Sequence, residues 1–176
     1  MPNYRRVFAA GYSYFITVVT YKRQPLLIEN IDLLRQVFAE SKQFYRYTIV
    51  AIVVLPDHFH MIIEPEDPLA YPKIVSYIKR KFSYLLNQKT PSNSANSLSR
   101  EKKRESNIWQ RRFYEHTIRD EKDFARHFDY IHYNPIKHRH TKEVKEWQYS
   151  SFHKFVRLGW YDALWCNFPD TLDLGE

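Results

Sequence analysis

Two histidines in an apolar segment are the residues of this sequence whose spacing best suits chemistry. His58 and His60 lie two positions apart within residues 55–63 (LPDHFHMII). In an extended strand, residues i and i+2 project from the same face, so the two imidazoles are expected to lie side by side. Such a pair can chelate one metal ion, or it can consist of two ordinary strand histidines that only form hydrogen bonds. The spacing alone leaves both interpretations open.

A tyrosine on a predicted helix offers a second reactive group. Polar side chains between residues 121 and 134 recur at spacings of four, three and four, which places them on one helix face: Asp123, His127, Tyr130 and Asn134. An apolar stripe on a different face is expected to pack against a sheet, and it comprises Phe124, Phe128 and Ile131. Tyr130 is therefore either a reactive phenol with polar neighbours or a half-buried tyrosine at the edge of the core.

The elements that must position these residues follow from the periodicity of the apolar side chains. Segments of β-branched, aromatic or continuous apolar residues predict strands over residues 12–21, 47–55, 58–64 and within 108–119. Apolar residues at helical spacing predict helices over residues 30–45, 72–87 and 121–134. Asp120 is expected to cap the last helix and Pro135 to end it, because the position before a proline disfavours helical geometry.

The order of these elements defines the expected fold. The first six follow the order β-α-β-β-α-β, which is typical of a ferredoxin-like antiparallel sheet with helices on one side. We therefore predict an α+β fold in which the helix that bears Tyr130 is an addition at the C-terminal end of this unit. One domain over residues 1–176 accounts for the whole chain, with a C-terminal tail from about residue 141.

Composition limits the kind of protein that this can be. The chain is 44% hydrophobic and 17% aromatic, with 14 tyrosines and a formal net charge of +7. Such a chain is globular, and its charge and flat rings suit phosphates and unpaired bases, although the charges could also serve solubility alone. A single cysteine, Cys166, excludes an internal disulfide and is typical of a reducing compartment. With no apolar run of transmembrane length and no signal-peptide segment, we expect a soluble cytoplasmic protein without a membrane partner.

Basic residues are distributed over several segments that could contact a nucleic acid. Residues 89–107 have few apolar side chains and a late cluster of lysine and arginine, so they are expected to form a flexible loop. This loop could clamp a ligand or be a mere linker, and the predicted helix over 72–87 has a face of cations and aromatics that suits DNA or solvent equally. The candidate DNA-binding residues are Arg5, Arg6, Lys73, Arg80, Arg100, Lys102, Lys103, Arg104, Arg111 and Arg112.

Three motifs in this order carry a resemblance to a known family. Residues 55–60 (LPDHFH), 108–116 (IWQRRFYEH) and 129–135 (DYIHYNP) resemble motifs of the REP-associated tyrosine transposases, which are relatives of the single-tyrosine HUH transposases. The resemblance extends over nearly the whole chain. It implies a metal-dependent endonuclease and strand transferase that acts on single-stranded DNA at REP-type hairpins. It places the metal ligands at His58, His60 and Asn134 and the nucleophile at Tyr130.

The residue types suit the chemistry that this resemblance implies. A phenol has an ordinary pKa of about 10 and is a weak nucleophile at neutral pH, so a divalent cation would have to polarise the scissile phosphate. Attack by Tyr130 would release a 3′-hydroxyl and leave a 5′-phosphotyrosine intermediate. The cation is expected to be Mg²⁺, which prefers oxygen ligands, or Mn²⁺, which accepts imidazole more readily. No Cys-x-x-Cys spacing indicates a structural zinc site.

Two other functions remain open from the sequence. A transposase-derived protein could hold a DNA hairpin without cutting it, although every residue of the expected site is present. Sheets of this topology also bind RNA, but the chain lacks the Lys/Arg-Gly-Phe type of motif that marks RNA-binding sheets. We expect a monomer, with a homodimer as the alternative, and a location on the bacterial nucleoid.

Overall fold

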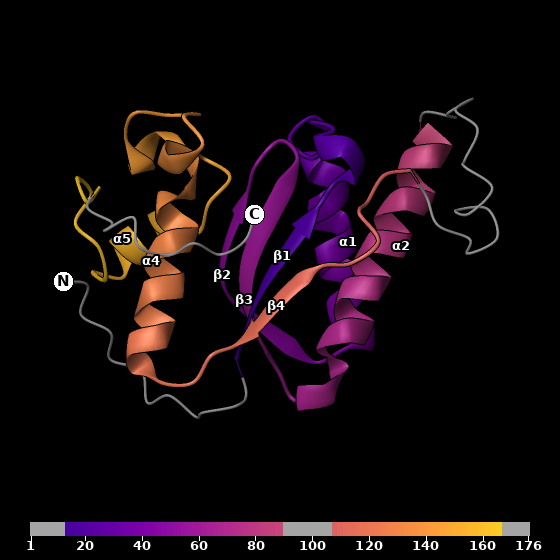
Figure 1. The fold of residues 1–176 in the computed structure, drawn as a ribbon, viewed down its shortest axis with the longest axis horizontal. Coiled ribbons are helices and arrows are strands. Elements are labelled where there is room, and N and C mark those ends of the chain that lie inside the picture. The colour runs from indigo at the N-terminus through magenta and orange to yellow at the C-terminus, as the bar shows by residue number, and fades with distance from the viewer. Residues whose placement is uncertain (1–12, 90–106, 167–176) are drawn as a thin grey trace.

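The computed structural model describes residues 13–89 and 107–166, and a four-stranded antiparallel sheet lies at the centre of the fold (Figure 1). The strands are β1 (Tyr14–Val19), β2 (Tyr47–Val54), β3 (His58–Pro65) and β4 (Tyr114–Thr117), in the spatial order β2-β3-β1-β4. The helices are α1 (Ile31–Phe44), α2 (Tyr71–Lys89), α4 (Glu121–Lys137) and α5 (Phe152–Arg157). Short 3-10 helices are η1 (Tyr21–Arg23), η2 (Pro68–Ala70) and η3 (Val144–Glu146). The predicted ferredoxin-like sheet is confirmed, and none of the helices in these ranges is long and apolar enough to cross a membrane.

Helices α1 and α2 cover one face of the sheet, on the right in Figure 1. Because side chains alternate along a strand, every second residue of β1 and β3 points into this layer. The antiparallel register pairs Val18 with Phe59 and Ile16 with Met61, and all four side chains are buried. The same core cluster includes Leu34 and Val37 of α1 and Ile78 and Phe82 of α2. This apolar layer leaves the other face of β3 for the histidines.

Helix α4 and residues 144–165, which we call the C-terminal segment, cover the opposite face, on the left in Figure 1. The register pairs Thr17 with His60 and Phe15 with Ile62 on this face, and all four side chains are buried. The two-residue spacing that gives the histidines one shared face therefore also turns them away from α1 and α2. The helices of the ferredoxin-like unit lie on one side, as predicted, and the added helix lies on the side of the histidines.

Helix α4 begins where the sequence predicts. Asp120 caps it, because its Oδ1 accepts a hydrogen bond from the backbone N–H of Asp123 at 2.8 Å. The apolar stripe that was expected to face the sheet is directed in part to the C-terminal segment, since the ring of Phe128 packs against Phe155, Trp160 and Tyr161. The helix is therefore buried on two sides, and its polar face meets the sheet.

The same helix ends at Lys137, so the expectation that it stops at Pro135 is wrong. In the last turn of a helix, a proline removes only one backbone hydrogen bond, and two hydrogen bonds that close the end of the helix offset this loss. The N–H of Arg139 donates to the carbonyl of Ile136, and the N–H of His140 donates to the carbonyl of Pro135, both at 2.9 Å. Arg139 has a positive φ of 58°, which is typical of the residue that closes a helix in this way.

The C-terminal segment joins α4 to the outer edge of β2. The backbone N–H of Val54 donates to the carbonyl of Tyr149, and the N–H of Ser151 donates to the carbonyl of Ile52, both at 2.8 Å. Oγ of Ser151 accepts a hydrogen bond from the N–H of Ile52 at 2.9 Å and lies 2.8 Å from Nε2 of His132 on α4. This serine therefore links the edge of the sheet to the helix.

Candidate active site

The imidazoles of His58 and His60 lie side by side, as the two-residue spacing predicts. Their ring centroids are 4.9 Å apart, and their planes are nearly perpendicular at 84°. Both side chains are buried, with 1% or less of their surface exposed. A ligand of this pair would therefore be shielded from bulk water.

Each imidazole is held by a hydrogen bond at Nδ1. Nδ1 of His58 lies 2.6 Å from Oδ1 of Asp57, and Nδ1 of His60 lies 2.8 Å from Oγ1 of Thr17. An ionised carboxylate only accepts, so the hydrogen of neutral His58 lies on Nδ1 and the lone pair on Nε2, and the hydroxyl of Thr17 allows the same tautomer at His60. Nε2 of His58 is a buried atom that forms no hydrogen bond within the described ranges, and Nε2 of His60 is likewise buried. An oxygen behind each imidazole is the outer support typical of metal-binding histidines.

Asp57 fixes the tautomer of His58, and it is a site residue that the sequence analysis missed. Burial raises the pKa of its carboxyl, but the hydrogen bonds and electrostatic interactions with His58 and Arg23 outweigh burial and lower this pKa from 3.8 to about 2. The guanidinium of Arg23 lies 3.3 Å from Oδ2 of Asp57. Thr20 holds the backbone, since its N–H and Oγ1 donate to the Asp57 carbonyl at 2.8 and 2.9 Å. The signal of Asp57 in the sequence is its position directly before His58.

Tyr130 lies on the face of α4 that meets the histidine pair. Its side chain has no exposed surface, and its ring lies edge-on to His60 with 5.4 Å between the centroids. Nζ of Lys137 donates a hydrogen bond to the phenol oxygen at 2.9 Å, and the same ammonium lies 4.7 Å from the ring centroid. Tyr130 is thus fully buried rather than half-buried, and its ring belongs to a core cluster with Phe15 and Phe128 while it also contacts His60 and Lys137.

The last turn of α4 contributes further side chains. Asn134 follows Tyr130 by one helical turn, and its Oδ1 is a buried amide oxygen. The ring of His138 lies 4.9 Å from that of His58. The sequence analysis missed Lys137 and His138 because a helix that stops at Pro135 does not carry them. Helical spacing continued by seven residues from Tyr130 would have led to Lys137.

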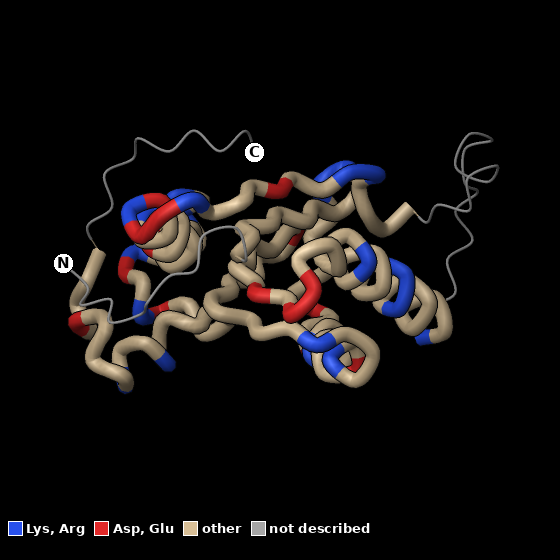
Figure 2. Tube along the Cα trace, turned by 90° about the horizontal axis from the view of Figure 1, so that it is seen from below, with Lys and Arg blue, Asp and Glu red and all other residues tan. Residues whose placement is uncertain are grey.

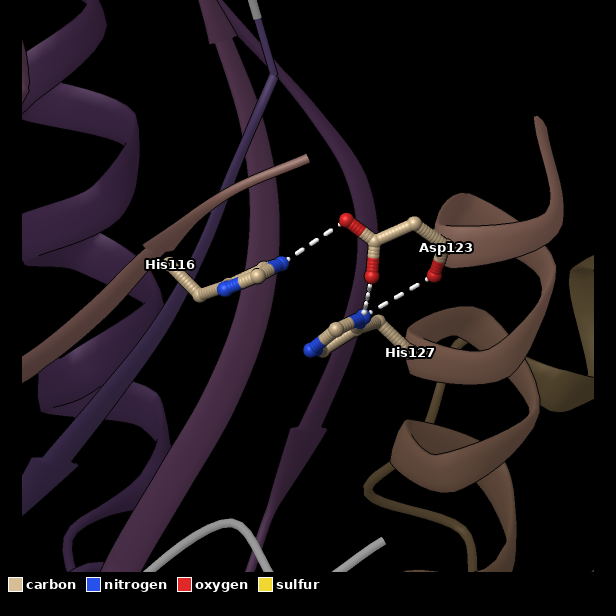
Figure 3. A group of neighbouring side chains, drawn as sticks. All are labelled: His116, Asp123 and His127. Atoms are coloured by element: carbon tan, nitrogen blue, oxygen red, sulfur yellow. Dashed lines mark hydrogen bonds and ion pairs between the residues drawn. The ribbon is translucent and has the colours of Figure 1, made fainter. Parts of the chain in front are cut away.

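A second polar cluster joins β4 to the first turns of α4 (Figure 3). Nε2 of His116 lies 2.8 Å from Oδ2 of Asp123, and Nδ1 of His127 lies 3.0 Å from Oδ1 of the same carboxylate. The predicted polar face of α4 thus serves two places: Asp123 and His127 meet His116, whereas Tyr130 lies beside His60. The ring of Phe15 packs against both His127, at 4.8 Å, and His60, at 5.5 Å, and so connects the two clusters.

The environment sets the charges of this second cluster. Burial raises the pKa of Asp123, but hydrogen bonds from His116 and from the N–H of Arg119, with the charges of the two histidines, lower it overall. Burial is also the main cause that lowers the pKa of His127. At neutral pH Asp123 is therefore a carboxylate and His127 a neutral imidazole.

Within the part of the chain that the structure describes, the candidate DNA-binding residues lie on α2 and on the segment before β4, which meet where Nζ of Lys79 donates to the carbonyls of Gln110 and Arg111 at 2.8 and 3.1 Å. Lys73 and Arg80 are exposed on α2, which lies on the face of the sheet opposite to His58. Arg111 and Arg112 are exposed in the segment before β4. Figure 2 shows lysine and arginine positions on both helical layers. The other candidates lie outside the described residues: Arg5, Arg6, Arg100, Lys102, Lys103 and Arg104.

A family model and several known proteins match this chain. A family model described as "Transposase IS200 like" matches residues 8–134. The chain is 42% identical to a REP-associated tyrosine transposase of Haemophilus influenzae over 100% of its own length and 99% of the relative. It is 34% identical to a REP-associated tyrosine transposase of Escherichia coli K12, with 100% of this chain and 98% of the relative covered. A solved structure of a REP-associated tyrosine transposase bound to a REP hairpin matches with a TM-score of 0.79 and 33% identity, over 100% of this chain and 98% of that chain.

Proposed function

This chain belongs to the REP-associated tyrosine transposases, within the IS200-like transposases, and on this premise we propose that it is a metal-dependent endonuclease and strand transferase for single-stranded DNA at REP-type hairpins. The observation that carries the proposal is the buried cluster of Tyr130, His58 and His60, in which a phenol lies beside two imidazoles held from behind at Nδ1. The full-length similarity to a relative that binds a REP hairpin supports such a hairpin as the partner.

The donor set fits a divalent cation. Nε2 of His58 carries a lone pair in a buried position without a hydrogen bond inside the described ranges, and the buried Nε2 of His60 belongs to the neighbouring ring. Asn134 adds a buried amide oxygen on α4. We take these three residues as the ligands of Mg²⁺ or Mn²⁺, and two imidazole donors favour Mn²⁺. When bound, the ion would polarise the scissile phosphate and orient it for attack.

Tyr130 is the nucleophile in this proposal. Its phenol oxygen loses a proton and bonds to phosphorus, while the bond from phosphorus to the 3′ oxygen of the preceding nucleotide breaks. The products are a 5′-phosphotyrosine and a 3′-hydroxyl, which takes up a proton. Lys137 stabilises the negative charge that develops on the phenol oxygen, because its ammonium already donates to this atom at 2.9 Å. The covalent bond conserves the phosphodiester, so a 3′-hydroxyl can rejoin the strand by the reverse reaction.

The burial of Tyr130 imposes a condition on this chemistry. Its side chain has no exposed surface, so a phosphate reaches the phenol oxygen only after a local movement of the chain around α4. The same burial favours a second candidate function, in which the protein binds a hairpin but does not cut it. The two functions differ in one measurable product, the covalent adduct of protein and DNA.

The adduct is therefore the test. A labelled REP-type hairpin with a single-stranded flank is incubated with the protein and Mn²⁺ and analysed on a denaturing gel. The wild type should form an adduct, and Tyr130→Phe should form none while it binds the hairpin with unchanged affinity, because only a hydroxyl is removed. Tyr133→Phe, on the same helix, is the matched control and should react normally. An adduct formed by Tyr130→Phe would show that another residue is the nucleophile, and hairpin binding without any wild-type adduct would support the second candidate.

The basic residues complete the proposal as contacts to the phosphates of the hairpin stem. Arg111 and Arg112 are exposed beside β4, and Lys73 and Arg80 are exposed on α2. The basic loop near 89–107 would add a clamp. We take the protein to act as a monomer on nucleoid DNA, which light scattering of the hairpin complex would test through its mass.

A further inference from the structure

The cluster between β4 and α4 has the ligand set of a second cation site. His116, Asp123 and His127 each offer one ligand atom, and these atoms all lie within 4.8 Å of one another. Figure 3 shows both imidazoles directed at the one carboxylate. We propose that these three residues bind a transition-metal ion of the zinc class, at a site separate from His58 and His60.

The distances suit an ion that replaces the shared hydrogens. Two ligands on a tetrahedral zinc ion, at metal–ligand distances of about 2.0–2.1 Å, lie about 3.4 Å apart. The present separations are those of hydrogen bonds, with 2.8 Å from His116 to Asp123 and 3.0 Å from His127 to Asp123. Shifts of roughly 0.5 Å would open them to the ligand spacing of a metal. Two imidazoles and one carboxylate, with a fourth position left open, form a common zinc-binding arrangement.

Hydrogen bonds account for His116, for Asp123 and for Nδ1 of His127, which lies 2.9 Å from the Asp123 carbonyl oxygen and 3.0 Å from Oδ1 of its carboxylate, but they do not account for Nε2 of His127. The hydrogen bond between His116 and Asp123 would by itself join β4 to α4. His127 stacks on the ring of His116, with 4.5 Å between centroids and 16° between planes, and only 2% of it is exposed. Its Nε2 is buried and forms no hydrogen bond with the residues that the structure describes, which is unfavourable for a neutral imidazole. An ion bound through Nδ1 would replace a hydrogen that this atom now shares with Asp123, whereas an ion bound through Nε2 would give the unpartnered atom of the ring a ligand role.

The cluster can be reached from solvent. A groove of about 390 Å³ is lined by the three proposed ligands together with Tyr114, Arg119, Asp120, Lys122 and Arg126. The cations of the groove would direct an anionic oxygen, such as hydroxide or a phosphate oxygen, to the open fourth position. The ring of Phe15 packs against both His127 and His60 and lies between the two sites. Substitutions at His58 and His60 therefore leave Phe15 in place beside His127.

Titration of the metal-free full-length chain with Zn²⁺ alone tests the proposal. Calorimetry counts the bound ions, and the visible absorption of Co²⁺ at the same site reports its geometry. The His58→Ala/His60→Ala variant should retain one Zn²⁺ per chain. Adding Asp123→Asn or His116→Ala in that background should weaken the remaining binding by more than about 10-fold, since loss of even an outer-shell partner has an effect of this size. In the otherwise wild-type chain, Asp123→Asn should remove one ion per chain.

Asp123→Asn is chosen because it keeps the size of the side chain and an oxygen that accepts from His116, so a loss of metal is not a loss of fold. Circular dichroism of each variant checks this. His153→Ala removes a histidine on α5, outside the cluster, and should leave binding unchanged. The proposal is overturned if the His58→Ala/His60→Ala variant binds no Zn²⁺, or if its binding survives both Asp123→Asn and His116→Ala. The cluster would then be a clamp between β4 and α4.

Discussion

Replacing Asp57 with asparagine tests how strongly the support behind the histidine pair stabilises the fold. The pKa of this carboxyl falls from 3.8 to about 2 in the folded chain, and one pKa unit corresponds to about 1.4 kcal/mol. The ionised carboxylate therefore contributes about 2 kcal/mol to the free energy of unfolding at neutral pH. The Asp57 side chain is 20% exposed, so solvent screening reduces this value only modestly. We expect Asp57→Asn to lose about this amount in the metal-free protein.

The loss should depend on pH with a definite sign. Because the pKa of Asp57 is lower in the folded chain than in the unfolded chain, its contribution is complete above about pH 5 and fades as the pH falls towards 2. At pH 3 about half of it should remain. Urea unfolding of the wild type and of Asp57→Asn, followed by circular dichroism at pH 7 and pH 3, measures the difference. A difference that is the same at both pH values refutes the assigned role of the carboxylate.

Two further measurements sharpen this prediction. Asp32→Asn removes the same charge from an exposed pair with Arg35 on α1, and it should change the free energy of unfolding by less than about 0.5 kcal/mol. Asparagine at position 57 still offers an oxygen to Nδ1 of His58 but no charge. The affinity of the histidine pair for Mn²⁺, measured by calorimetry, should therefore fall by about 10- to 100-fold.

Three other predictions concern the reaction and the DNA. His58→Ala/His60→Ala should abolish Mn²⁺-dependent cleavage of the hairpin while circular dichroism shows a folded chain, and full activity that EDTA still inhibits would place the metal elsewhere. Lys137→Met should slow adduct formation by about 10- to 150-fold, because a hydrogen bond to a charged group contributes about 1.5–3 kcal/mol. The control variant Lys145→Met on η3 should leave the rate unchanged. Equal rates for the wild type and Lys137→Met would show that Lys137 has no part in the mechanism. Neutralising the basic loop residues together should flatten the log–log dependence of hairpin affinity on salt by roughly 0.7–0.9 for each DNA phosphate that the loop neutralises in the wild type, and an unchanged slope would show that the loop is a solvated linker. The loop residues to be replaced are Arg100, Lys102, Lys103 and Arg104.

Local periodicity predicted the parts of the site that a single element determines. The alternation of a strand places His58 and His60 on one face whatever else packs there, and the register with β1 confirms it. The spacing of α4 likewise grouped Tyr130 with Asn134. These predictions hold because they depend on backbone geometry over a few residues, which the sequence displays directly.

Contacts between distant elements are where the sequence analysis failed. The oxygen that supports His60 belongs to Thr17 on another strand, and its 43-residue separation leaves no periodic signal. The pairing of His116 on β4 with Asp123 and His127 on α4 depends on how a strand and a helix dock. Lys137 was missed for a local reason, because the end of α4 was placed at Pro135, although the closing hydrogen bonds beyond it allow the helix to continue.

Helix α4 carries Tyr130, Asn134 and Lys137, so the site exists only while this helix is docked on the sheet, and a buried network from the C-terminal segment holds it there. His132 is fully buried on the far side of α4, and burial lowers its pKa to about 3, so it is a neutral ring at physiological pH. Its Nδ1 lies 3.1 Å from the hydroxyl of Tyr161, which donates to Asp129 at 2.6 Å, and its Nε2 meets Ser151 on the edge of β2. A neutral imidazole satisfies both contacts, whereas protonation would leave an uncompensated charge among apolar rings. The C-terminal segment thus determines the position of the phenol relative to the histidines through a set of hydrogen bonds that lies on the opposite side of the helix from the phenol.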